Sequence, residues 1–349
     1  MLTFYSDTHT RHAPTTEYLH GHDVPFFEMP QRLHNIRDAL LAAGLIDVQA
    51  APRRATRAEL ERAHDPGMLD YLAEVSLNVM DTLRTDLGIY DMQDEVRGDE
   101  YYYESVFPPH GPGAGTNPAR RRFYIFDSTS PIGAGTWDAV LDSASLAVAG
   151  AEALLSGEKA AYALCRPPGH HAGHNFMGGY CYVNNAAVAA HVLKARGKVA
   201  ILDVDYHHGN GTQSIFWDDP DVLFVSLHAD PAVDYPYYAG FADETGPSNT
   251  NINVPLPHGT DEAAYLSALN GALGRIQAFA PTALVISLGF DPYHGDPMGH
   301  FALDVESFTA LGAAIAGVGL PTLYVQEGGY AIDHLGAMAV AFFQGVQAE

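Results

Sequence analysis

Histidine and acidic residues gather directly after four short apolar segments of this chain. The four polar stretches are RPPGHHAGH from Arg166, DVDYHHGNGT from Asp203, GFD from Gly289 and QEGGY from Gln326. A single histidine or aspartate at such a position is more often a cap or a satisfied polar group than a ligand. Four together point to one site, because open α/β sheets bind ligands outside the carboxyl ends of their strands. So many charged groups in one place would repel unless a metal ion or a proton network held them.

Two carboxylates and one imidazole are spaced to hold a metal ion. Asp205 and His207 lie two positions apart, so in an extended segment their side chains point the same way. Asp291, from the end of another apolar segment, can supply a third ligand. This donor set, with an open position for water, suits Zn²⁺, and Fe²⁺ or Co²⁺ also fits it. The ion would polarise a carbonyl group and lower the pKa of a bound water to roughly 7.

The adjacent His170 and His171 are candidates for proton transfer beside this ion. A carboxylate such as Asp203 would raise the pKa of the histidine that it contacts, and the neutral Asn210 would raise it less. One histidine could then stay charged while the other acts as a general base. Tyr330 follows two glycines, which fits a phenol that moves towards a developing oxyanion. Taken alone, the two glycines fit an ordinary turn better.

The segments that must position these residues alternate between strand-like and helical patterns. The expected strands are Leu2–Tyr5, Ala161–Cys165, Val199–Leu202, Val222–Leu227, Ala283–Leu288 and Thr322–Val325. The expected helices are Gln31–Ala43, Trp137–Leu155, Asn185–Ala195, Glu262–Phe279, Val305–Ala316 and His334–Gly345. The strands do not alternate strictly between polar and apolar residues, as expected when helices cover both faces of a sheet. The sequence therefore predicts a single α/β domain over residues 1–349 with a mostly parallel central sheet.

The charge of the chain limits its partners. A formal net charge of −24 on 349 residues argues against nucleic acid or an anionic membrane, because like charges repel. The charge is compatible with a small cationic substrate, and equally with the acidic proteome of a salt-adapted organism. The N-terminus MLTFYSDTHT lacks the features of a signal peptide, and no apolar run is long enough to span a bilayer. With only two cysteines, Cys165 and Cys181, we expect a cytoplasmic protein without a disulfide framework.

Residues 88–122 depart from the strand–helix pattern. They are rich in tyrosine, proline, glycine and charged residues. An insertion of this length inside a compact domain is usually functional or disordered. The run Tyr101, Tyr102 and Tyr103 favours an ordered interaction surface.

Six motifs resemble those of the histone deacetylase superfamily, in the same order along residues 161–330. They are RPPGHHAG, GGYCYVNNAA, ILDVDYHHGNGTQ, VSLH, SLGFDPYHGDP and EGGY. The stretches TTEYLHG and FEMPQR also resemble the bacterial acetylpolyamine amidohydrolases within that superfamily. So many ordered motifs make a specific match. The resemblance implies a single arginase/deacetylase-like α/β domain.

The resemblance also implies roles for the residues singled out above. Zinc would be bound by Asp205, His207 and Asp291. His171 would be the general base and acid, and His170 would be an electrostatic catalyst paired with Asp203. Tyr330 would polarise an acetamide carbonyl and stabilise the tetrahedral intermediate. Asn210 stands where many eukaryotic relatives carry aspartate. In this it matches the amidohydrolase subgroup.

Further features carried over from the family concern substrate and assembly. Gly179, Tyr180 and Tyr235 would line a substrate tunnel, whose aromatic walls suit an aliphatic chain. Glu17 would meet the distal ammonium group of the substrate. The alternative is that this single glutamate is an ordinary solvated carboxylate. Residues 88–122 would build a homodimer and narrow the mouth of the active site. A structural potassium ion is expected near the following residues: Asp203, Asp205, His207 and Ser226.

The sequence thus predicts zinc-dependent hydrolysis of the acetamide of a small cationic acetylated amine, such as acetylputrescine or acetylcadaverine. Acetyl-lysine, free or in a peptide or protein, is the alternative substrate. A ureohydrolase with two manganese ions would require carboxylates at two positions that are occupied by Gly209 and Tyr293. A non-catalytic metal-binding protein would often have lost Tyr330, His170 or His171, and all three are present.

Overall fold

The computed structural model describes residues 1–19, 22–79, 101–102 and 124–348. The insertion predicted at 88–122 therefore lies outside the described residues, apart from the short strand β5 (Tyr101–Tyr102). None of the helices in the described part of the chain has the length and hydrophobicity needed to cross a bilayer.

A parallel sheet forms the centre of the molecule, and the described residues contribute eight strands to it in the order β10-β9-β8-β11-β12-β7-β1-β4. The strands are β1 (Leu2–Phe4), β4 (Asp47–Gln49), β7 (Ala160–Ala163), β8 (Val199–Asp203), β9 (Val222–Ala229), β10 (Asn251–Leu256), β11 (Ala283–Leu288) and β12 (Thr322–Gln326). Every neighbouring pair runs parallel. All six strands expected from the sequence are present, and the predicted fold class is confirmed.

The two strands of this sheet that the sequence did not predict, β4 and β10, lie at its two edges. Both have partly exposed positions, so neither shows the continuous apolar run of a strand covered on both faces. Two short antiparallel pairs lie apart from the main sheet. They are β2 (Thr16–Leu19) with β3 (His22–Pro25), and β5 with β6 (Ile132–Gly133).

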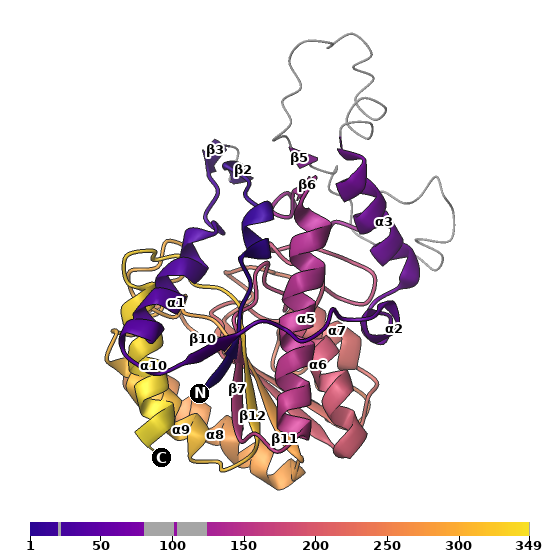
Figure 1. Ribbon diagram of the computed structural model, residues 1–349. Helices are drawn as coiled ribbons and strands as arrows, with labels where there is room; N and C mark the ends of the chain where they lie inside the picture. Colours follow the sequence, from indigo (N-terminus) through magenta and orange to yellow (C-terminus); the bar gives the residue numbers. More distant parts are fainter. Residues whose placement is uncertain (20–21, 80–100, 103–123, 349) are drawn as a thin grey trace.

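Helices cover both faces of the sheet (Figure 1). They are α1 (Gln31–Ala42), α2 (Arg57–Leu60), α3 (Pro66–Leu77), α5 (Thr136–Leu155), α6 (Asn185–Leu193), α7 (Asn210–Phe216), α8 (Glu262–Phe279), α9 (Ser307–Ala316) and α10 (Leu335–Ala348), with the 3₁₀ helices η1 (Asp7–Arg11) and η3 (Lys194–Arg196). Side-chain caps fix several starts. Asn184 accepts a hydrogen bond from the Ala187 N–H at the start of α6, and Asp261 accepts one from the Ala264 N–H at the start of α8.

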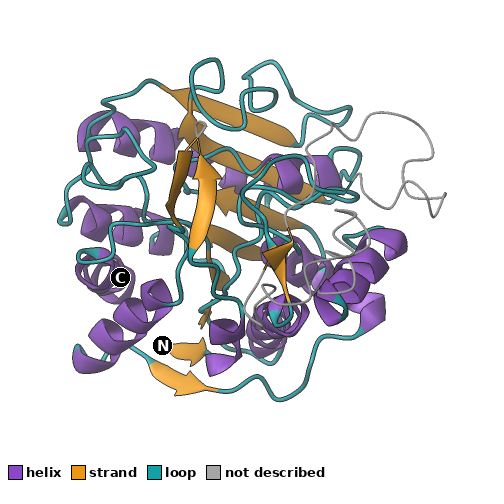
Figure 2. Ribbon diagram, turned by 90° about the horizontal axis from the view of Figure 1, so that it is seen from above, coloured by secondary structure: helices purple, strands orange, loops and turns teal. Residues whose placement is uncertain are grey.

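Two apolar cores result, one on each side of the sheet. Figure 2 shows from above the helices that lie on the two sides of the strands. Successive residues of β7 alternate between them: Ala161 and Ala163 pack with α3, α5 and α6, whereas Tyr162 packs with α1, α8, α9 and α10. The central strands are thus buried on both faces, which accounts for their continuous apolar sequences.

Sheet order explains how the polar stretches meet. The strands that precede the four clusters, β7, β8, β11 and β12, are adjacent in the order β8-β11-β12-β7. Because all four run parallel, their carboxyl ends lie along one edge of the sheet, and the polar residues that follow them converge there.

Candidate active site

The three predicted metal ligands come together in the structure. Nδ1 of His207 lies 3.4 Å from Oδ1 of Asp205 and 3.3 Å from Oδ2 of Asp291. All three residues are buried, and one donor atom from each lies within 4.8 Å of the others. The loops after β8 and β11 therefore bring two carboxylates and one imidazole to a single point.

The surroundings of these side chains fit a divalent cation. Burial, followed by repulsion from Asp205, raises the pKa of Asp291. Burial opposes the charged form of His207, but the two carboxylates outweigh it and raise its pKa to about 10. Positive charge between the two acids offsets their repulsion. Two oxygen donors with one nitrogen donor suit zinc and similar transition metals.

Two glycines leave the room that the carboxylates occupy. A Cβ atom at Gly328 would lie 2.6 Å from Oδ2 of Asp205 and still closer to Oδ2 of Asp291. A Cβ atom at Gly289 would lie 2.6 Å from Oδ1 of Asp291 and would also collide with Asp205. The Gly328 N–H donates to Oδ2 of Asp205 at 2.8 Å, which fixes the orientation of that carboxylate.

Gly328→Ala is therefore expected to weaken metal binding on the order of tenfold or more, because the added methyl group displaces both carboxylates. Titration of the metal-free protein with Zn²⁺ measures the change. Gly271→Ala is the matched control, since its Cβ atom meets nothing within 4 Å on α8. That variant should bind metal normally and gain about 0.5–1 kcal/mol of stability. Unaltered affinity in Gly328→Ala would refute the steric argument.

The two adjacent histidines have different partners. Nδ1 of His170 lies 3.0 Å from Oδ2 of Asp203, and Nδ1 of His171 lies 2.7 Å from Oδ1 of Asn210. Burial opposes the charge on His170, but Asp205 and Asp203 outweigh it and raise its pKa to about 10. Burial and then the neighbouring His170 and His207 hold the pKa of His171 well below its ordinary value. The structure thus pairs a charged imidazole with a neutral one, 3.9 Å apart between ring centres.

Tyr330 is held from both sides. Its backbone N–H donates to Oδ2 of Asp296 at 2.6 Å, and the guanidinium of Arg32 lies 4.8 Å from the centre of its ring. Burial raises the pKa of the phenol well above its usual range, so the hydroxyl group keeps its proton. Gly329 has a φ of 110°, and its carbonyl accepts from Nε of Arg32 at 2.6 Å. The two glycines before Tyr330 thus have different roles. Gly328 leaves room for the carboxylates, and Gly329 allows the positive φ of the backbone.

A pocket opens above these residues. His171, His207 and Tyr330 lie among the residues that line a cavity of about 810 Å³. Other lining residues are Phe27, Phe126, Asp127, Gly179, Tyr180, Asp234, Tyr235, Tyr237, Tyr238, His258, Met298 and His300. The structure thus places the predicted wall residues Gly179, Tyr180 and Tyr235 at the pocket.

Three residues without a predicted role support the site. Oδ2 of Asp127 accepts from the Gly179 N–H at 2.8 Å and the Tyr235 hydroxyl at 2.6 Å, which ties two wall residues together. The Tyr238 hydroxyl accepts from Nδ2 of Asn210 at 2.7 Å. Oε2 of Glu327 accepts from the Gly169 N–H at 2.7 Å and so holds the loop that carries the two histidines. Isolated Asp127 and Tyr238 gave no sequence signal, whereas Glu327 stood at a strand end.

Glu17 does not line the pocket. It is only 2% exposed, and its carboxylate accepts from the Tyr180 hydroxyl at 2.8 Å and from the Phe27 N–H at 3.0 Å. It lies behind the wall that Tyr180 forms, so its contact with a substrate ammonium group stays a prediction. Ser226 is the strand neighbour of Asp203, and its hydroxyl lies 2.8 Å from Nδ1 of His228. The potassium site also stays a prediction.

The sequence and the fold match known proteins. The model of the histone deacetylase domain matches residues 26–346. The chain is 42% identical over 352 residues to acetylpolyamine amidohydrolase 2 of Pseudomonas aeruginosa and 38% identical over 364 residues to acetylpolyamine amidohydrolase of Mycoplana ramosa, with 99% of both chains covered in each case. A crystal structure of acetylpolyamine aminohydrolase from Burkholderia pseudomallei aligns with a TM-score of 0.91 at 39% identity, covering 100% of this chain and 99% of that one. The chain belongs to the histone deacetylase family.

Proposed function

We propose that this protein is a zinc-dependent deacetylase that hydrolyses the acetamide of small cationic amines such as acetylputrescine and acetylcadaverine, releasing acetate and the free amine. The observation that carries the proposal is the buried group of Asp205, His207 and Asp291, whose His207 lines one pocket together with His171 and Tyr330. Full-length relatives named acetylpolyamine amidohydrolase support the choice of substrate.

The residues around the metal site divide the chemistry between them. A zinc ion held by Asp205, His207 and Asp291 supplies Lewis acidity towards the carbonyl group and the water. His171 accepts the proton of the attacking water at Nε2, because Nδ1 is engaged with Asn210. It then returns this proton to the departing amine nitrogen.

Charge and hydrogen bonding stabilise the reacting oxygen. The phenol of Tyr330 keeps its proton and donates a hydrogen bond to the carbonyl oxygen as negative charge develops there. The charged form of His170 is favoured beside Asp203, and its charge keeps the neighbouring His171 neutral, so that Nε2 of His171 is free to accept a proton.

The lining of the pocket is compatible with an aliphatic chain. Phe126, Tyr180 and Tyr235 contribute aromatic surface that can hold a short methylene chain. The net charge of −24 favours the approach of cations. As further parts of this proposal, residues 88–122 form a homodimer contact and narrow the mouth, Glu17 contributes negative charge behind Tyr180, and potassium binds near Asp203 and Ser226.

Rates on four substrates test the substrate class. N-acetylputrescine, N-acetylcadaverine, an acetylspermidine and an acetyl-lysine peptide are compared through kcat/KM. We expect the acetylated diamines to give the largest values, because a short cationic chain fits the pocket. A largest value for the peptide would instead identify an acetyl-lysine deacetylase, and no turnover of any substrate would exclude the proposed function.

Removal of the metal is expected to abolish turnover, because no other group on the pocket floor supplies Lewis acidity among the described residues. Dialysis against a chelator, followed by addition of Zn²⁺, tests this and should restore the rate. Asp291→Asn should bind one metal equivalent fewer than the unaltered protein in elemental analysis. Full activity in the chelated protein would contradict the proposal.

Asn210→Asp is expected to move the acid limb of the rate profile to higher pH by about one unit or more. A carboxylate beside Nδ1 of His171 favours the protonated imidazole and so raises its pKa, and His171 acts as a base only when neutral. The rate is therefore lost at low pH and largely kept on the alkaline side. Measurement of kcat/KM from pH 5 to 9 decides the point. Asn249→Asp, which adds the same charge at an exposed turn, should leave the limb in place.

A further inference from the structure

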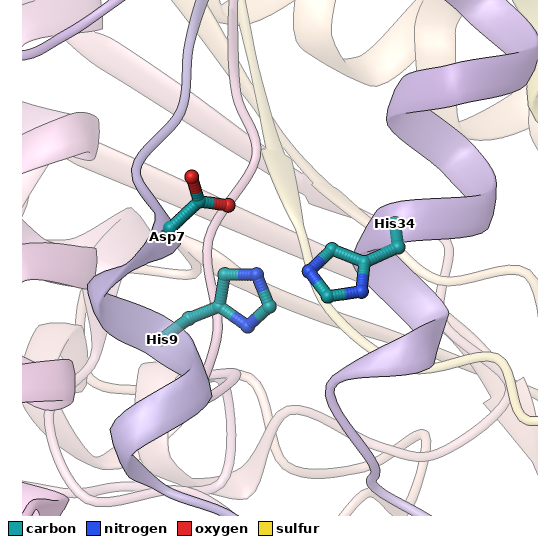
Figure 3. Close-up of side chains that lie close together, drawn as sticks. All are labelled: Asp7, His9 and His34. Carbon is teal, nitrogen blue, oxygen red and sulfur yellow. The ribbon is translucent and has the colours of Figure 1, made fainter.

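A second group of potential metal ligands lies outside the pocket. Asp7 and His9 belong to η1 and His34 belongs to α1, and one donor atom from each lies within 4.8 Å of the others. Figure 3 shows the rings of His9 and His34 facing each other across the space between the two elements, with the carboxylate of Asp7 close by. The ring centres of the two histidines are 5.2 Å apart.

Most donor atoms of this group are unused. Among the described residues, no hydrogen bond involves Oδ2 of Asp7, Nδ1 of His9 or either ring nitrogen of His34. His9 is 3% exposed and His34 is half-buried, so Nδ1 of His9 is withdrawn from water without a hydrogen-bond partner among the described residues, and the ring of His34 is partly withdrawn from water.

Two neighbours compete for Asp7 without closing the site. Nη1 of Arg37 lies 3.4 Å from Oδ1 of Asp7, but Nε of the same guanidinium donates to Asp38 at 2.8 Å, and its plane lies over the ring of Tyr5. Arg37 therefore keeps two contacts if Asp7 turns away. The Tyr5 hydroxyl donates to Oδ1 of Asp7 at 2.6 Å and lies 3.1 Å from Nε2 of His9. It can orient both ligands from outside the metal shell.

The ligands must draw closer to hold an ion, since Zn–N and Zn–O distances are about 2.0–2.2 Å. Asp7 can make this adjustment, because its side chain is 77% exposed and only Oδ1 has hydrogen-bond partners among the described residues. Two imidazoles and one carboxylate form a donor set that Zn²⁺ and similar transition metals accept.

We propose that Asp7, His9 and His34 form a second binding site for a divalent transition metal ion, separate from the one on the pocket floor. An ion there would join η1 to α1. These two elements hold the loops of the active site: the carbonyl of His9 accepts from Nη1 of Arg166 at 2.7 Å, and Arg32 of α1 donates to the carbonyl of Gly329 at 2.6 Å. The second ion therefore stabilises the frame on which the catalytic loops rest.

Metal content of the full-length protein tests the proposal. Chelator-treated protein is dialysed against a slight excess of Zn²⁺ and its zinc is measured by elemental analysis. We expect two equivalents in the unaltered protein, and one in His34→Gln and in the separate variant Asp7→Asn. Asp291→Asn should also hold one equivalent, and the Asp291→Asn/His34→Gln double variant none. His294→Gln is the matched control, because His294 is half-exposed and pairs with a single carboxylate, Asp304, at 3.2 Å; it should retain two.

Thermal unfolding gives an independent readout. Zn²⁺ should raise the Tm of Asp291→Asn, in which only the second site remains, by roughly 3 °C or more, and should leave the double variant unchanged. Saturation of the unaltered protein at one equivalent would overturn the second site, and so would two equivalents in both His34→Gln and Asp7→Asn. If Asp291→Asn bound as much zinc as the unaltered protein or lost it independently of His34 and Asp7, that result would concern only the proposed metal site on the pocket floor.

Discussion

His171→Ala is expected to lower kcat by about 10²–10⁴-fold at neutral pH, because it removes the group proposed to take the proton from water. The imidazole is buried, its pKa is held well below the ordinary value by burial and by His170 and His207, and its Nδ1 is fixed 2.7 Å from Oδ1 of Asn210. It is thus neutral and oriented before substrate binds. Steady-state rates on N-acetylputrescine measure the loss.

His174→Ala is the control for this substitution. His174 lies on the same loop, but its side chain is exposed and its Nδ1 contacts only the carbonyl of Ala63 among described residues, at 3.2 Å. It should keep its activity. Zinc content should be unaltered in both variants, since neither residue belongs to the predicted ligand set. If His171→Ala turned over substrate at the original rate, the base would have to be another residue.

Tyr330→Phe is expected to lower kcat by about 10²–10³-fold, as for the loss of one oxyanion donor. The change removes only the hydroxyl group. The phenyl ring can keep its contact with the guanidinium of Arg32, and the backbone hydrogen bond to Asp296 does not involve the side chain. The loss should therefore appear in kcat with little change in KM or in metal content, because the donor acts mainly in the transition state.

Tyr324→Phe tests whether any buried tyrosine of this region would give the same effect. Tyr324 is 1% exposed, lies on β12 just before the loop of Tyr330, and packs in the apolar core away from the pocket. It should retain full turnover. Equal rates for Tyr330→Phe and the unaltered protein would remove Tyr330 from the proposed mechanism.

Local sequence was sufficient to predict the central strands and the grouping of the three proposed metal ligands. β8 and β11 are buried on both faces, so their sequences are continuous apolar runs that can be recognised without knowledge of their neighbours. Asp205 and His207 follow one such run at a spacing of two, which brings both to the same side of an extended segment. The residue types at strand ends thus predicted a group of possible ligands, and the structure brings Asp205, His207 and Asp291 together.

Tertiary structure decided what depends on contacts between distant segments. The adjacency of β8, β11, β12 and β7 determines which strand ends meet. The edge strands β4 and β10 carry no strong local pattern because their faces are partly exposed. The same holds for single residues: Asp127 joins two residues of the pocket wall, and Glu17 turns behind Tyr180 instead of into the pocket. A residue's type and spacing determine which chemistry it can perform, whereas packing over long sequence separations determines which partners it meets.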